Sequence, residues 1–198
     1  NGFASSLTVN SHQADTTVGF LTKDDITKVN LMGAYTQENY HVSATFTSQR
    51  NGFAAFDYYA TGTLDGNGDD VDGWALRAWW RPDDVGTAVP SVSVGYDTLS
   101  FDTTNGFREA SGYNVGLNWE DIFQPSDTIG VSFGQPLKGD DHTNPATKDV
   151  DPFMWEVYYS FKPNDSIEIV PGIFGVTDGW KDDDDDLFGA MLQTTFKF

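Results

Sequence analysis

The sequence predicts an all-β chain that forms an antiparallel transmembrane β-barrel of the kind found in outer membranes. First, apolar and polar residues alternate with a period of two along most of the chain. Second, the alternating segments are long: membrane strands need ~9–11 residues, whereas strands of soluble proteins average ~5–6. Third, compact turns alternate with long polar loops, which is typical of such barrels.

The amino-acid composition limits the domain organisation, the sites and the partners that the chain can have. The chain has 198 residues, enough for one domain, and we expect residues 1–198 to form a single barrel domain. It contains no cysteine, which excludes disulfides, thiolate metal sites and cysteine nucleophiles. Acidic residues outnumber basic ones 30 to 11, for a formal net charge of -19. Nucleic acid is therefore excluded as an expected partner, because little positive charge is present to displace its counterions.

The alternation predicts eleven strands. Segment 74–81 illustrates it, with Trp74, Leu76, Ala78 and Trp80 on one face and Ala75, Arg77, Trp79 and Arg81 on the other. Segment 187–198 alternates in the same way up to the final Phe198. The other clear strands are 40–49, 112–119, 154–162 and 166–173, and weaker patterns predict strands at about 2–10, 15–22, 28–36, 91–101 and 127–135.

The connections predict how the strands cross the membrane. The compact ones are 37–39, 81–90, 120–127 and 162–165, and the long polar ones are about 50–73, 101–111, 136–151 and 176–186. If the last strand runs toward the periplasm, these compact turns fall on the periplasmic side and these long loops fall outside. Porin-type barrels have this asymmetry.

The odd number of strands needs an explanation, because closed bacterial barrels usually have an even number. One reading is a further strand hidden in 53–59, which would make twelve. The reading we favour is that the chain is the C-terminal portion of a larger barrel, with Asn1 at the outer rim.

Each face of the predicted strands carries its own set of candidate residues. Aromatic rings on the apolar face are expected to form membrane girdles at the headgroup level: Tyr40, Trp74, Trp80, Trp119, Trp155, Tyr159, Phe161 and Phe198. Polar residues on the other face are expected to line the pore: Lys28, His41, Arg77, Arg81, Asp97, Asn114, Asn118, Glu156, Glu168 and Lys197.

Charges on the pore-lining face would set ion selectivity. Arg77 and Arg81 are predicted to lie on one strand as a basic ladder, with acids such as Asp97 and Glu156 opposing them. The alternative is that each is an ordinary solvated residue without a special role. The acidic runs 65–72 and 181–186 are interpreted as solvated loops that attract cations to the mouth. The first run lacks the glycine and glutamate positions of a calcium-binding EF-hand, so no metal site is predicted.

Five stretches carry a resemblance to a known family: 74–84, 111–123, 127–136, 155–165 and 190–198. Together they resemble the C-terminal half of carbohydrate-selective, OprB-type porins, above all their cyanobacterial branch. The resemblance is good from about 73 to 198 and thinner before it. The closing Phe198 resembles the C-terminal signal of outer-membrane barrels. The sequence shows no surface-layer-homology segment, which usually precedes the barrel in that branch.

The resemblance implies an outer-membrane β-barrel of porin type that passes small hydrophilic solutes by diffusion. Sugars are among these solutes, with inorganic ions as the alternative. It implies no cofactor. The implied partners are outer-membrane lipid, lipopolysaccharide, the transported solutes and sister subunits in a homotrimer.

Three other functions are alternatives to this one. One is a secreted or surface β-sandwich that binds glycans through exposed aromatics, and another is a non-conducting barrel that acts as an adhesin or anchor. An enzyme is not predicted. The three histidines, His12, His41 and His142, have no assignable catalytic partner, and no nucleophile elbow, phosphate loop or metal-ligand spacing is present.

Overall fold

The structure is a computed structural model. It describes residues 1–11, 18–51, 57–58, 62–63, 70–103, 106–145, 151–178 and 186–197. Phe198 and most of the acidic runs 65–72 and 181–186 lie outside the described residues, so the expectations placed on them are not addressed below.

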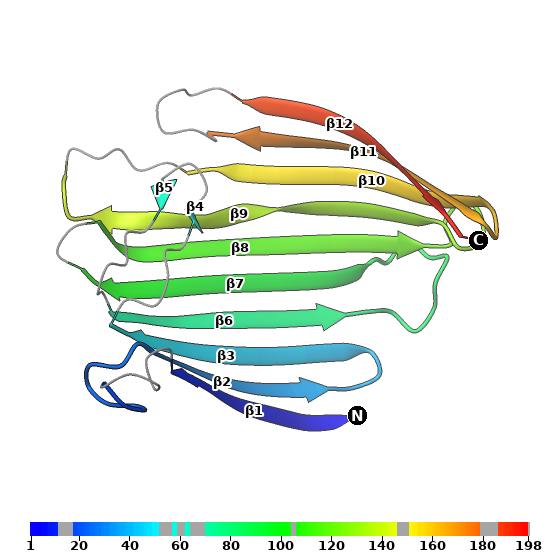
Figure 1. Cartoon of the computed structure of the whole chain (residues 1–198). Coiled ribbons are helices and arrows are strands. Elements are labelled where there is room, and N and C mark those ends of the chain that lie inside the picture. The colour runs from blue at the N-terminus through cyan, green and yellow to red at the C-terminus, as the bar shows by residue number, and fades with distance from the viewer. Residues whose placement is uncertain are drawn as a thin grey trace.

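Ten strands form one antiparallel sheet in which each strand pairs with the next along the chain (Figure 1). The strands are β1 (Gly2–Ser11), β2 (Thr27–Thr36), β3 (Tyr40–Arg50), β6 (Asp70–Trp80), β7 (Ser91–Asp102), β8 (Phe107–Glu120), β9 (Thr128–His142), β10 (Phe153–Asn164), β11 (Ile167–Thr177) and β12 (Leu187–Phe196). Two short strands, β4 (Asp57–Tyr58) and β5 (Gly62–Thr63), form a separate ribbon, and β4 lies beside β9.

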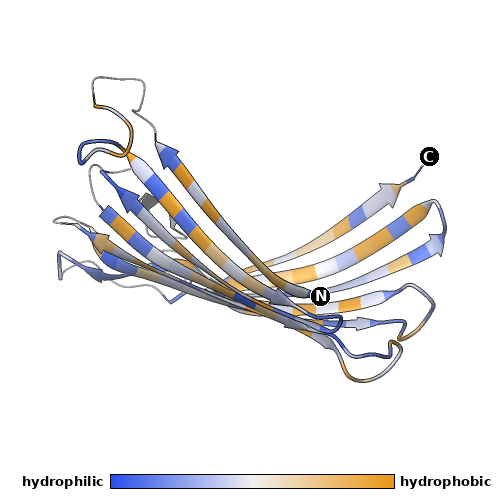
Figure 2. Ribbon diagram, turned by 90° about the horizontal axis from the view of Figure 1, so that it is seen from below, coloured by the Kyte–Doolittle hydropathy of each residue, from blue (hydrophilic) through white to orange (hydrophobic). Residues whose placement is uncertain are grey.

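The all-β prediction is confirmed. Strand lengths run from 10 residues in β1 to 15 in β9, so every strand of the large sheet is long enough to cross a bilayer. Figure 2 shows that the sheet curves into a trough and that hydrophobic and hydrophilic segments alternate along the strands. The sheet is open, with β1 and β12 as its two edges.

The predicted strand at 15–22 is wrong in its described part, because Val18–Thr22 forms turns; residues 15–17 lie outside the described residues. β1 pairs directly with β2, and Gly2 lies opposite Thr36. The first strand therefore starts at the end that carries the compact turns, where Figure 1 also places the C-terminus. The expectation that Asn1 lies at the outer rim is wrong for the same reason.

The two kinds of connection lie at opposite ends of the sheet, as predicted. The turn end holds 37–39, 81–90, 121–127 and 165–166. The large-sheet strands that flank 12–26, 51–69, 103–106, 143–152 and 178–186 meet at the other end, called the loop end below. The predicted loop 101–111 is wrong in length, because β7 and β8 leave only 103–106 between them. β8 extends beside β9 here, and Arg108 Nη1 lies 3.2 Å from an Asp141 carboxylate oxygen across the two strands.

Strand register divides the side chains between two faces, because directly paired residues point to the same side of a sheet. One set of partners is Ser43, Arg77, Gly95, Asn114, Gly134 and Met154, and its side is called the polar face below. The neighbouring set is Val42, Ala78, Val94, Val115, Phe133 and Trp155, and its side is called the apolar face.

Many large apolar side chains on the apolar face are exposed, which would be unfavourable in water. Leu76 is 45% exposed and Leu192 is 70% exposed, and both lie among many exposed apolar side chains of the same face. A contiguous apolar surface on this scale indicates an apolar surrounding. Val157 is 36% exposed, and within the described residues the large sheet has only the two-stranded ribbon as a companion. The β-sandwich alternative is therefore not supported.

Aromatic side chains gather in two rows on the apolar face. Near the turns, Tyr35 and Tyr40 lie 6.0 Å apart and Tyr159 and Phe161 lie 5.4 Å apart, measured between ring centroids. Toward the loops, Trp74 packs at 5.0 Å from Phe46 and Trp155 at 6.1 Å from Phe188. The predicted girdle residues Tyr40, Trp74, Trp80, Trp119, Trp155, Tyr159 and Phe161 all lie on this face. Their girdle role stays a prediction.

The turn between β8 and β9 is organised by one carboxylate. Asp127 is 1% exposed and accepts hydrogen bonds from the backbone N–H groups of Ile122, Phe123 and Gln124 at 2.9–3.1 Å. The Tyr159 hydroxyl donates a further one at 2.9 Å. Burial alone would raise the pKa of Asp127, but these hydrogen bonds to its charged form outweigh burial and lower the pKa. The turn therefore depends on the ionised carboxylate.

We predict that Leu76→Arg destabilises the protein in lipid by about 2–4 kcal/mol, because it places a charge in the apolar face near the middle of β6. The neighbouring Ala75→Arg is the matched control, because it puts the same side chain on the polar face and is expected to cost far less. Urea unfolding in lipid vesicles measures both. Equal destabilisation by the two variants would contradict the assignment of the faces.

We predict that Asp127→Asn lowers the thermal unfolding midpoint at pH 7, with Asp165→Asn in the β10–β11 turn as control. Because the folded pKa of Asp127 is depressed, its stabilisation is present above the unfolded value of ~3.9 and is lost as the pH falls through the lower folded value. The difference between the wild type and Asp127→Asn should therefore shrink in strong acid. A difference that does not change with pH would exclude this role.

Candidate functional site

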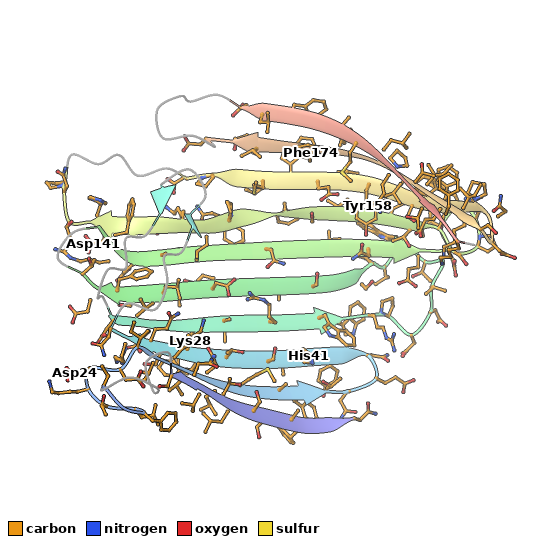
Figure 3. All side chains as sticks on the ribbon, viewed as in Figure 1. Asp24, Lys28, His41, Asp141, Tyr158 and Phe174 are labelled. Atoms are coloured by element: carbon orange, nitrogen blue, oxygen red, sulfur yellow. The ribbon has the colours of Figure 1, made fainter. Side chains whose placement is uncertain are left out.

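The polar face brings together most of the residues predicted to line a pore. Strand register places the following predicted residues on it: Lys28, His41, Arg77, Asp97, Asn114, Asn118, Glu156 and Glu168. Figure 3 labels Lys28 and His41 among the side chains of the sheet. Arg81 and Lys197 follow the ends of β6 and β12, and the Lys197 N–H donates to the Ser166 carbonyl at 2.8 Å. The function of these residues stays a prediction.

Arg77 and Asp97 form an ion pair along the wall. The Arg77 Nη2 atom lies 2.7 Å and 2.8 Å from the two carboxylate oxygens of Asp97. Nη1 donates to the carbonyls of Leu76 and Tyr96. The sequence-based expectation set Asp97 opposite Arg77 across a pore. In the structure it lies on the adjacent strand, and the pair carries no net charge.

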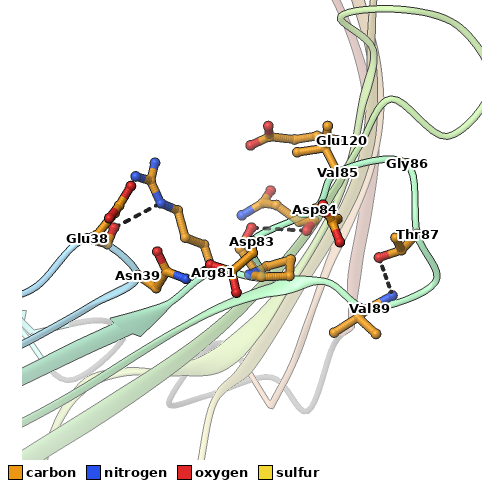
Figure 4. Close-up of a pocket in the computed structure, with 13 residues that line it drawn as sticks. Glu38, Asn39, Arg81, Asp83, Asp84, Val85, Gly86, Thr87, Val89 and Glu120 are labelled. Carbon is orange, nitrogen blue, oxygen red and sulfur yellow. Dashed lines mark hydrogen bonds between the residues drawn. The ribbon is translucent and has the colours of Figure 1, made fainter.

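Arg81 is held at the turn end rather than in a ladder with Arg77. Its Nε donates to the Glu38 carbonyl at 3.1 Å, and its guanidinium lies 5.9 Å from the centroid of the Trp79 ring. Figure 4 shows Arg81 beside a hollow between two turns, with Asp83, Asp84 and Glu120 also in its lining. The ladder predicted from the spacing of Arg77 and Arg81 is therefore not formed.

His41 extends the aromatic surface of the polar face toward the turns. Its ring stacks on Trp79, with 6.2 Å between centroids and an interplanar angle of 5°. Its Nδ1 lies 2.8 Å from the Thr36 hydroxyl oxygen. Trp79 thus belongs to the polar face, as the alternation predicts, and it contributes to a surface on which flat molecules can stack.

Glycines on the polar face let large side chains lie along the wall. A Cβ atom added at Gly130 would come within 2.1 Å of the Tyr158 ring, and one at Gly189 within 2.3 Å of the Phe174 ring. The Tyr158 hydroxyl donates to Asn118 Oδ1 at 2.9 Å, which ties β10 to β8 across β9. The two rings therefore lie against the sheet and do not project far from the polar face.

The two glutamates of the polar face differ in their surroundings. Glu168 accepts a hydrogen bond from the Ser160 hydroxyl at 2.7 Å. Glu156 has no hydrogen bond or ion pair to any described residue. Sequence reasoning selects both glutamates but misses Tyr158 and Phe174, although the alternation of 154–162 already places Tyr158 on the same side as Glu156.

An apolar cluster covers the loop end of the polar face, which sequence reasoning also misses. Val71, Phe101, Phe107 and Ala110 are buried there, and Leu99 and Leu137 pack against them. All of these residues except Leu99 fall in segments predicted as loops, because the prediction does not follow the period of two through those segments. This end of the face is therefore not a continuous polar surface.

Within the described ranges, no group of three or more His, Asp or Glu side chains is arranged to hold a metal ion. The same ranges contain no helix of the length and apolarity needed to span a bilayer.

A meander of long antiparallel strands with one apolar and one polar face is the wall architecture of a porin-type outer-membrane β-barrel. The chain matches the family model described as carbohydrate-selective porin, OprB family, over residues 2–198. It belongs to this family, and the resemblance predicted from the sequence is confirmed. Family membership implies an outer-membrane location.

The chain is also similar to an uncharacterized protein of the cyanobacterium Nostoc sp., with 28% identity over 158 residues. The match covers 79% of this chain and 27% of the relative, so the chain spans about a quarter of that protein. No solved structure matches the chain significantly.

We predict that Gly130→Ala lowers single-channel conductance. The added methyl group forces the Tyr158 ring off the wall toward the water-filled side and breaks its hydrogen bond to Asn118, at a stability cost of about 1 kcal/mol. Gly33→Ala is the matched control, because a Cβ there meets nothing within 4 Å and Gly33 lies on the apolar face. Planar-bilayer recordings measure both variants. Wild-type conductance in Gly130→Ala would show that the ring does not border the conducting path.

Proposed function

We propose that this chain forms part of the wall of an outer-membrane channel that passes small hydrophilic solutes and ions by passive diffusion. One observation carries the proposal: the same ten-stranded sheet has an exposed, aromatic-rich face and a polar face. A curved sheet of this kind separates lipid on one side from water on the other. Family membership supports the same function.

We propose further that residues 1–198 are the C-terminal portion of a single, larger barrel domain. The backbone groups at the free edges of β1 and β12 would be unsatisfied in hydrocarbon, which is costly. Additional strands of the same protein would pair with these edges and close the barrel. The greater length of the cyanobacterial relative supports this arrangement.

Charge on the polar face favours cations over anions. Asp97 cancels the charge of Arg77, while Glu156 has no cationic partner among the described residues. The formal charge of -19 makes the surroundings of the mouth attractive to cations as well, an effect that salt screens. Saccharides are among the proposed solutes because the family model is described as carbohydrate-selective.

The apolar face would contact outer-membrane lipid, and its loop end would contact lipopolysaccharide. Sister subunits in a trimer would cover part of the same face. These partners follow from the proposed membrane location.

Reconstitution tests the proposed channel. The full-length protein, purified in detergent, should produce stepwise conductance in planar bilayers. A protein that inserts without conducting would be an anchor or adhesin instead, and a protein that stays monodisperse without detergent would not be a membrane barrel.

We predict that Arg77→Glu raises the cation preference in reversal-potential measurements, because it replaces a neutral pair by two adjacent carboxylates. Asp97→Asn should move the preference in the opposite direction, since it leaves Arg77 uncompensated. The exchange Arg77→Asp with Asp97→Arg is the control, because the pair keeps zero net charge and selectivity should stay near that of the wild type. Unchanged selectivity in Arg77→Glu would remove Arg77 from the narrow part of the pore.

A further inference from the structure

Glu156 lies on the polar face with aromatic residues on two sides. Strand register sets it opposite Phe174 on β11 and opposite Ser132 on β9. Tyr158 follows two residues later on the same face of β10. Directly opposite residues have Cβ atoms ~4.5–5.5 Å apart, so the side chains of Glu156 and Phe174 begin side by side, and the Phe174 ring then extends over Gly189 on β12. Figure 3 labels Tyr158 and Phe174 on these adjacent strands.

Both rings are pre-positioned by the glycines beneath them. Tyr158 rests over Gly130 and is fixed by its hydrogen bond to Asn118, and Phe174 rests over Gly189. A hollow of about 390 Å³ lies beside Glu156 and Phe174, and its lining also includes Asn114 and Ser132. This volume accepts a small organic molecule.

Among the acids that the structure describes in this region, Glu156 differs in its lack of partners. Asp97 is occupied by Arg77 and Glu168 by the Ser160 hydroxyl, whereas Glu156 has neither kind of partner among the described residues. A carboxylate beside aromatic faces attracts a cation twice, through its own charge and through the negative faces of the rings. A neutral sugar could stack and donate hydrogen bonds, but it would leave the negative charge uncompensated.

We propose that Glu156 and Phe174 form a binding site in this hollow for small organic ammonium ions. The acidic surroundings of the mouth would raise the local concentration of such cations. The path taken by the bound ion rests on the proposed channel function, whereas the binding itself can be measured without conduction.

Saturation-transfer NMR on the full-length protein tests the site, with tetramethylammonium as probe. An uncharged ethylene-glycol ether detergent is required, because choline and maltoside detergents carry competing groups. Glu156→Gln should weaken binding about tenfold or more, as expected for loss of a charged partner. Phe174→Leu should weaken it about 2–5-fold, as expected for loss of a cation–π contact.

Glu168→Gln is the matched control, because it removes the same charge from the same face and should change binding less than about twofold. Equal binding to the wild type and Glu156→Gln would overturn the proposal. So would binding of glucose that depends on Glu156 and Phe174 when tetramethylammonium does not bind, because the site would then be a saccharide site. Bilayer recordings made in parallel separate the two proposals: a conducting channel without Glu156-dependent binding refutes only the ammonium site, and binding without conductance refutes only the channel.

Discussion

Everything in this structure depends on pairing the backbone N–H and C=O groups away from water. In hydrocarbon an unpaired group costs several kcal/mol, so a strand that crosses a bilayer must be paired on both edges. The inner strands of the large sheet, β2, β3 and β6 to β11, meet this condition because each pairs with a strand on both sides. The same constraint leaves the edges of β1 and β12 as the two whose backbone groups still need partners in hydrocarbon.

Pairing also fixes which side chains meet lipid and which meet water. A slip of one residue would turn every side chain of a strand to the other face and would move Arg77 into lipid. The register shift between Ser111 and Tyr113 is tolerated because it lies toward the loop end, beyond the apolar zone of β8. Small residues also shape the polar face, because Gly130 and Gly189 leave space for the Tyr158 and Phe174 rings to lie against the sheet.

The sequence predicts the faces well because alternation is a local property: the sides of Trp74, Arg77 and Glu156 follow from their neighbours alone. It fails where a pattern lacks a pairing partner, as at 18–22, and where a strand continues into a segment that contains several polar residues, as at 107–111. A local pattern also cannot predict which side chains make contact between strands. The Arg77–Asp97 pair and the isolation of Glu156 depend on inter-strand register and on rotamers, which no single segment encodes.

The central claim is that one face of the sheet meets lipid and the other meets water. Because the chain has no cysteine, a spin label can be attached to single cysteines placed one at a time along 74–80 of β6 in lipid vesicles. The account predicts that even-numbered positions respond to oxygen dissolved in lipid and odd-numbered positions to a water-soluble nickel complex. Equal responses at successive positions would contradict it.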